Sequence, residues 1–170
     1  MSATQTSFNQ FPGRALEGQL GDPSLCNVRS LVNGESTAEV PFGVMVAWGD
    51  DGKAELVDSG DDSLAGIVVH SHNHQKDRQL GDDGIKPDEP MNVLRQGVVF
   101  VKATEAVEPG DTVRVRHSGT GQAGEFLKDA EAGETLDISD FAQWLDKGAA
   151  GDIVRLEIDM TNAAQASADA

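Results

Sequence analysis

Short runs of β-branched and aromatic residues, separated by glycine- and proline-containing turns, recur along most of this chain. Turn signals such as Asn33-Gly34 and Pro109-Gly110-Asp111 return at roughly the 8–12-residue spacing that is typical of sandwiches and barrels. The strand-like runs occupy residues 39–48, 64–70, 97–103, 112–116 and 153–160. The sequence therefore predicts an all-β fold, either a jelly-roll-like sandwich or a small β-barrel.

One segment carries a helical pattern instead. In residues 139–147, SDFAQWLDK, the apolar side chains of Phe141, Trp144 and Leu145 fall at positions i, i+3 and i+4. The serine or aspartate at its start can cap a helix, and Gly148 suits the end of one. We expect one short helix here.

The predicted core consists of aliphatic residues within the strand-like runs. Some of these strands contribute residues of both phases, so the two-residue alternation of a half-buried strand predicts that a few are exposed. The candidates are Val44, Val46, Ile67, Val69, Val99, Val101, Val113, Val115, Ile153, Leu156 and Ile158.

The two ends of the chain differ from its middle. Near the N-terminus, large apolar residues are widely spaced among glycines, and Pro12 and Pro23 favour extended backbone before them. The last ten residues are mainly alanine, serine and aspartate. We therefore predict an extended N-terminal arm at 1–24, a β-rich body at 25–160 and a disordered tail at 161–170.

The charge is strongly one-sided. With 29 acidic and 13 basic residues the net charge is −16, which disfavours binding to nucleic acid or to anionic lipid. The chain contains no apolar run of about 18–20 residues that could span a bilayer. The N-terminal residues lack the basic and apolar parts of a signal peptide, which predicts synthesis in the cytoplasm without export.

The sequence lacks the motifs of common enzymes. It contains no GxSxG, HExxH or GxxxxGK[ST] motif. The single cysteine, Cys26, has no partner within the chain, and we interpret it as a small core residue. We expect a protein that is not an enzyme and has no cofactor.

Three histidines are the main candidates for a metal site. His70, His72 and His74 would share one face if a strand continued through them, and this spacing occurs in zinc sites. Cupin barrels carry a similar His-x-His followed by an acid and a glycine, and Asp77 and Gly84 follow at tolerable distances. The surrounding residues are polar in both phases, which favours solvated loop histidines. A cupin-like metal-binding β-barrel is the alternative.

Several segments together resemble a known family. The N-terminal QTSFNQFPGRALEGQLGD and the block VNGESTAEVPFGVMVAWG resemble the first part of structural cement proteins, the capsid decoration proteins of tailed bacteriophages. The later segments AGIVVHSH, LRQGVVFVKATEAVEPGDTVRV and GDIVRLEI fit the same family in order. The resemblance covers about residues 5–160 and leaves out the acidic stretch at 75–90.

The resemblance implies a structural function. Such proteins bind the exterior of the mature capsid and bridge neighbouring capsomers, so the expected partners are the major capsid protein and other copies of this chain, with a dimer favoured over a trimer. The arm would attach to the capsid by adding to a strand or filling a groove. Its candidate capsid-binding residues are Phe8, Phe11, Pro12, Arg14 and Leu16.

Two further alternatives concern the surface and the arm. Trp48 could serve as a platform for sugars, which would favour a carbohydrate-binding β-domain on the virion. Trp144 lies on the apolar side of its segment and is expected in the core. The arm could also fold back over its own sheet instead of reaching a capsid.

Overall fold

The computed structural model describes residues 15–71, 84–161 and 167–168. All strand pairs among these residues are antiparallel, and the one helical element among them is the 3-10 turn η1 (Asp50–Gly52). The described part contains no helix that is long and apolar enough to cross a membrane. The all-β prediction is confirmed.

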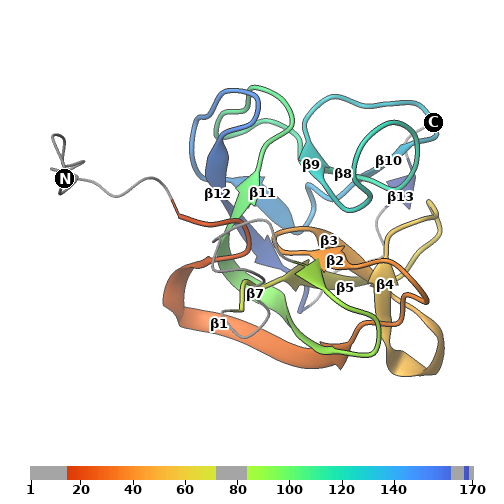
Figure 1. Cartoon of the computed structure of the whole chain (residues 1–170). Helices are drawn as coiled ribbons and strands as arrows, with labels where there is room; N and C mark the ends of the chain where they lie inside the picture. The colour runs from red at the N-terminus through yellow and green to blue at the C-terminus, as the bar shows by residue number, and fades with distance from the viewer. Residues whose placement is uncertain (1–14, 72–83, 162–166, 169–170) are drawn as a thin grey trace, which may run out of the picture.

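Seven strands form the large sheet (Figure 1). Six follow the order β11-β12-β7-β5-β3-β4, and the seventh, β1, pairs with β7. Their bounds are β1 (Leu20–Val32), β3 (Met45–Trp48), β4 (Ala54–Leu56), β5 (Leu64–Val68), β7 (Pro90–Lys102), β11 (Ala142–Trp144) and β12 (Ile153–Asp159).

Two smaller sheets complete the fold. The four-stranded sheet has the order β13-β10-β8-β9, and β2 pairs with β6. Their bounds are β2 (Val40–Pro41), β6 (Gly84–Ile85), β8 (Arg114–Arg116), β9 (Phe126–Leu127), β10 (Thr135–Asp137) and β13 (Ser167–Ala168). The described sheets are open and form a sandwich, not the closed barrel that the sequence left as an alternative. Ser167 and Ala168 of the predicted tail form β13 and pair with β10 of the body.

The core consists of two apolar clusters on opposite faces of the central strands. In β3, Met45 belongs to the first cluster and Val46 to the second, and in β5 Ile67 and Val68 divide in the same way. The first cluster also contains Val115, Phe126 and Leu136 of the four-stranded sheet, while the second contains Val40 and Ile85 of the β2–β6 pair. The central strands are therefore covered on both faces, so both phases of the valine-rich runs are buried.

The predicted helix at 139–147 is wrong. The centre of this segment is β11, which pairs antiparallel with β12 through Ala142↔Ile158 and Trp144↔Leu156. Its burial alternates, since Ala142 and Trp144 are buried and Gln143 is exposed. Nine residues give a marginal helix, whereas a strand here adds ladder hydrogen bonds along β12. Trp144 is in the core as predicted, and its Nε1 donates to Thr112 O at 3.1 Å.

One buried arginine secures the loops of the four-stranded sheet. Arg116 is 7% exposed, and its Nε donates to Glu125 Oε1 at 2.7 Å while Nη2 donates to Glu131 Oε1 at 3.0 Å. Hydrogen bonding to Arg116 lowers the pKa of the Glu131 carboxyl. Glu134 lies 3.7 Å from the same guanidinium. This end of the molecule is thus held by buried apolar contacts and by a charge network.

Candidate functional site

The strand β1 is long but poorly buried. Ten of its 13 residues are exposed and none is buried. It carries all three large apolar side chains that are highly exposed in the described part of the chain: Leu25 at 81%, Val28 at 37% and Val32 at 37%. Exposed apolar side chains that cluster on one element commonly mark an interaction surface, so β1 is the leading candidate.

A bulge divides β1 into two paired segments. Leu20 and Asp22 pair with Val99 and Val98, whereas residues 27–32 pair with residues 96–90 of β7. Residues 23–26 leave the ladder between these segments. Asp22 Oδ1 stabilises the bulge by accepting hydrogen bonds from the Ser24 amide at 2.8 Å and the Ser24 hydroxyl at 2.6 Å, and these bonds lower the pKa of Asp22.

Gly97 of β7 allows the bulge to approach. Its φ is +133°, and a Cβ there would lie 2.9 Å from Leu25 O. Only glycine combines this conformation with this contact at little cost. Cys26 lies on the bulge and is exposed, so the prediction that it is a core residue is wrong. Its thiol contacts Pro23 O at 3.6 Å.

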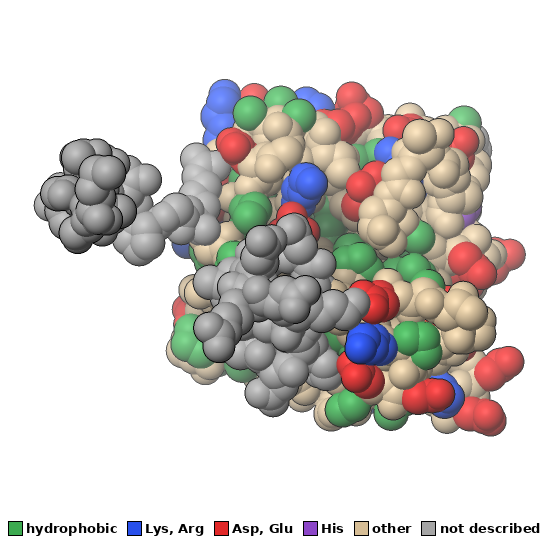
Figure 2. Space-filling model, viewed as in Figure 1, with side chains coloured by type: hydrophobic (Ala, Val, Ile, Leu, Met, Phe, Trp, Pro, Cys, Tyr) green, Lys and Arg blue, Asp and Glu red, His purple; other side chains and the backbone are tan. Residues whose placement is uncertain are grey.

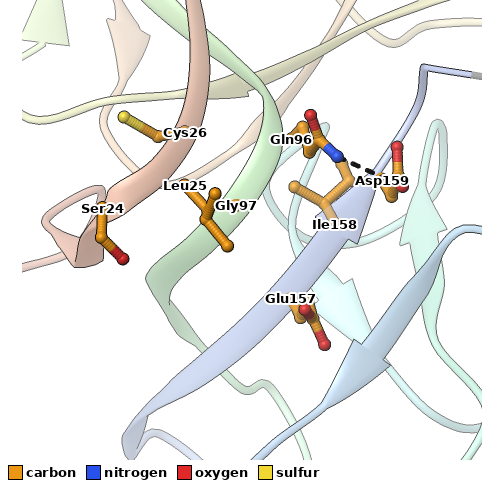
Figure 3. A pocket seen from close by; sticks show the side chains of 8 residues that line it. All are labelled: Ser24, Leu25, Cys26, Gln96, Gly97, Glu157, Ile158 and Asp159. Atoms are coloured by element: carbon orange, nitrogen blue, oxygen red, sulfur yellow. Dashed lines mark hydrogen bonds between the residues drawn. The ribbon is translucent and has the colours of Figure 1, made fainter.

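A groove of about 320 Å³ runs beside the bulge (Figure 3). Leu25 lies on the β1 side, Glu157 and Ile158 of β12 lie on the other, and Gly97 lies between them. Gln96 Nε2 donates to Asp159 Oδ2 at 3.4 Å within this lining. Hydrogen bonds from the Thr161 side chain and backbone, with a smaller one from Gln96, lower the pKa of Asp159. The groove thus combines one exposed apolar side chain with two carboxylates.

The charge around β1 differs from that of the rest of the chain. No acidic residue occurs between Asp22 and Glu35, although the chain carries 29 of them, and Arg29 gives this stretch a single positive charge. In Figure 2, acidic side chains gather instead at the lower right, over the loops that flank β4. The exposed surface of β1 is therefore a weakly charged region on a strongly acidic protein.

The described start of the chain is fixed to the body at Gly18. The Gly18 amide donates to Phe100 O at 2.7 Å, the His70 amide donates to Gly18 O at 2.8 Å, and the Phe100 amide donates to Gln19 O at 2.8 Å. Gly18 has φ +76°, and a Cβ there would lie 2.7 Å from His70 N. The backbone at Gly18 therefore lies between Phe100 of β7 and His70, and there is no room there for a side chain.

Most of the predicted arm site lies outside the described residues. Phe8, Phe11, Pro12 and Arg14 belong to that part, so their assignment stays a prediction. Leu16 is described and is half-buried, with its amide bonded to Gln19 Oε1 at 3.2 Å. Within the predicted arm of residues 1–24, the structure places residues 18–22 beside β7 and begins β1 at Leu20.

His70, from the metal-site alternative, and Trp48, from the carbohydrate-binding alternative, both pack against other residues of the body. The His70 ring packs against the Phe42 ring at a centroid distance of 4.7 Å, while His72 and His74 lie outside the described residues. The described residues contain no group of three histidine, cysteine or acidic side chains arranged for a metal ion. Trp48 is half-buried against the second apolar cluster.

The sequence reasoning missed β1 as a surface. It placed residues 25–32 within the β-rich body at 25–160 and assigned no surface role to them. The available signal was the acid-free stretch at 23–34 with its spaced Leu25, Val28, Leu31 and Val32. Periodicity alone cannot show how much of such a strand is covered by neighbouring strands.

Solved phage structures include a chain of similar fold. A capsid chain of Myoviridae phage XM1 is similar in fold, with a TM-score of 0.69, 19% identity and coverage of 93% of this chain and 98% of that one. The base of the phi29 head fibre, gp8.5, is a more distant match, with a TM-score of 0.42, 14% identity and coverage of 82% and 99%.

The sequence comparisons are more specific. No curated protein sequence matches the chain significantly. The family model described as "Structural cement protein (E217 gp24/Pam3 gp6)" matches residues 4–159. The chain therefore belongs to the structural cement protein family and has a capsid-associated structural role in the phage virion.

Proposed function

We propose that this protein binds the exterior of the mature capsid and bridges neighbouring capsomers, without a catalytic step. The observation that carries the proposal is the family match over residues 4–159, which includes most of the N-terminal arm as well as the body. Its partners are the major capsid protein and other copies of the same chain. Many identical weak contacts, repeated over a symmetric shell, together stabilise it.

The charge supports an exterior position. A chain with a net charge of −16 is repelled by packaged DNA, so it is better suited to the outer surface of the shell than to the inner one. The charge also limits contact between neighbouring copies to surfaces with few acids.

The arm is the proposed capsid-binding element. Phe8, Phe11 and Leu16 would fill apolar depressions on the capsid, and Arg14 would pair with a carboxylate there through a charge-assisted hydrogen bond. Three backbone hydrogen bonds at Gly18 and Gln19 connect this segment to the body. A contact made by the arm is therefore transmitted to the large sheet.

Deletion of residues 1–14 tests this proposal. The cut stops before Ala15 because residues 15–18 are half-buried or buried against the body. We expect the shortened protein to melt at nearly the same temperature and to lose most of its affinity for expanded capsids in a co-sedimentation assay. Unchanged binding would contradict the proposed role of the arm.

A matched pair of variants separates side-chain contacts from chain length. We expect the double substitution Phe8→Ser and Phe11→Ser to weaken capsid binding at least about tenfold, because each large buried aromatic side chain contributes a few kcal/mol. The control, Ser7→Ala with Asn9→Ala, changes neighbouring polar residues and should bind like the native protein. Equal binding by both variants would overturn the assignment of the two phenylalanines.

A further inference from the structure

A buried asparagine lies directly after the end of β1. Asn33 is 0% exposed, and Gly34 follows it in the only Asn-Gly pair of the sequence. Asparagine before glycine is chemically labile, because the glycine amide meets little steric resistance when it attacks the side-chain carbonyl carbon. Such pairs usually occur in turns at the surface, whereas this asparagine is enclosed by the body.

The side chain of Asn33 is fully hydrogen-bonded. Its Nδ2 donates to Ile85 O at 2.8 Å and to Ala38 O at 3.3 Å, and its Oδ1 accepts from the Glu35 amide at 2.9 Å. A primary amide has two N–H groups, and the two carbonyls can use both of them. The side chain is therefore fixed between backbone groups from two separate segments of the chain.

The peptide group between Asn33 and Gly34 is held at both of its polar ends. The Asp88 amide donates to Asn33 O at 3.0 Å, and the Gly34 amide donates to Ala54 O at 2.9 Å. A parallel bridge between Asn33 and Ala54 accompanies the second bond and forms what we call the β1–β4 junction. Because the peptide group is planar, it cannot turn without breaking both hydrogen bonds.

Deamidation of Asn33 requires that these contacts break. In this reaction the Gly34 nitrogen bonds to Cγ of Asn33, the Cγ–Nδ2 bond breaks, and Nδ2 leaves as ammonia with the proton of the Gly34 amide. Water then opens the resulting succinimide ring at either carbonyl and leaves aspartate or isoaspartate. In the folded protein the attacking nitrogen is bonded to Ala54 O, and Asn33 has no exposed surface for water to reach.

We propose that Asn33 is a deamidation site that the fold keeps closed, so that its modification marks molecules in which the β1–β4 junction has opened. A buried carboxylate here places an acceptor opposite Ile85 O and Ala38 O, which is unfavourable. Isoaspartate also lengthens the backbone by a methylene group and displaces the Gly34 amide from Ala54 O. The modified junction therefore cannot close as before. This inference goes beyond the proposed function and does not depend on it.

A comparison of folded with unfolded protein tests the protection. Native protein is incubated at mildly alkaline pH in buffer and in urea above its unfolding midpoint, and modification of Asn33 is followed by mass spectrometry of the peptide that contains it. If only open molecules react, the rate scales with their population. We expect a rate at least about a hundredfold lower in the folded protein. Similar rates would overturn the proposal.

A variant that loosens the junction should raise the rate in the folded protein. Glu35 Oε1 accepts from the Leu56 amide of β4 at 2.9 Å, so Glu35→Ala removes a bond that holds the chain after Asn33 to β4. We expect the ratio of the folded to the unfolded rate to rise about tenfold. The control Ser36→Ala changes an exposed side chain and should leave this ratio within about twofold. Equal ratios for the two variants would show that the reaction does not pass through this junction.

The product can be imitated by substitution. Asn33→Asp introduces the carboxylate directly, and we expect the folding equilibrium constant near neutral pH to fall at least about thirtyfold in urea unfolding. Asn92→Asp is the matched control, because Asn92 of β7 has an exposed side chain, and it should change the constant by less than about threefold.

The pH dependence of Asn33→Asp gives a second measurement. Burial raises the pKa of a carboxyl, and a protonated carboxyl again offers a donor to Ile85 O. Relative to native protein at the same pH, the loss in the folding constant should therefore shrink as the pH falls toward about 4. A variant as stable as Asn92→Asp, or a loss that does not change with pH, would contradict the proposal.

Discussion

β1 and β7 have the same length and are hydrogen-bonded to each other, yet they differ in what surrounds them. Six of the 13 residues of β7 are buried and three are exposed, whereas β1 has no buried residue and ten exposed ones. β7 has three strand neighbours, β1, β5 and β12, while β1 pairs with β7 and meets β4 only just after its end, through the bridge between Asn33 and Ala54. Folding of one chain thus surrounds β7 with strands and leaves most of β1 exposed, with β4 beside its last residues.

The largest expected contrast comes from matched leucines on the two strands. Leu94 of β7 is fully buried, so Leu94→Ala should reduce the free energy of unfolding by about 3 kcal/mol through lost burial and a cavity. Leu25 of β1 is 81% exposed, and Leu25→Ala should change it by less than about 0.5 kcal/mol. Urea unfolding of both variants at one protein concentration measures the two changes in the free energy of unfolding. Similar losses would show that β1 contributes to the core as β7 does.

An intermediate effect is expected where the two strands touch. Gly97→Ala should cost about 2 kcal/mol, because the new Cβ would meet Leu25 O and the backbone would be held at a positive φ. The control is Gly110→Ala, which has φ +97° and no neighbouring atom within 4 Å, and it should cost only about 1 kcal/mol of backbone strain. Equal unfolding free energies for the two variants would mean that the bulge of β1 can move away from the new Cβ at no energetic cost.

The smallest effect concerns pH. The pKa of Glu131 is lowered in the folded protein, so its contribution to stability is present above the ordinary value near 4.5 and is lost as the pH falls through the lowered value. Glu131→Gln should therefore reduce the fall in the urea midpoint between about pH 5 and pH 3. Asp22→Asn in β1 should reduce it less, because the two hydrogen bonds that lower the pKa of Asp22 both come from Ser24, two residues away. A larger effect from Asp22→Asn would reverse this ranking.

The core was largely predictable from sequence, and the expected errors of phase did not occur. Ten of the eleven predicted core residues are buried, including Val46 and Val115, and Ile153 is half-buried. The two-residue alternation predicted that a few of these residues would be exposed, because it assumes that only one face of each strand is covered. The separate β2–β6 pair and the four-stranded sheet cover opposite faces, which no local pattern could reveal.

Other features depend on contacts between distant segments. The spacing of Phe141, Trp144 and Leu145 fits a helix as well as a strand over so short a stretch, and the available edge of β12 decides the outcome. The strand-like run at 97–103 is part of a longer strand that continues through Gly97, since its positive φ turns the backbone without ending the ladder. The exposed surface of β1 likewise depends on how far its strand neighbours extend along it, since among the described strands β4 reaches only its last residues, and a local sequence pattern does not show this.

The attachment at Gly18 has a mechanical consequence. A pull on the chain before this residue loads hydrogen bonds to Phe100 in β7 and to His70 after β5 at the same time, because Gly18 bonds to both. The force is divided between two separate places in the large sheet. The segment therefore cannot detach by breaking one of these hydrogen bonds at a time. If the arm binds the capsid as proposed, tension on it would be shared between two places in the large sheet and would reach the core of the molecule before β1 could separate from β7.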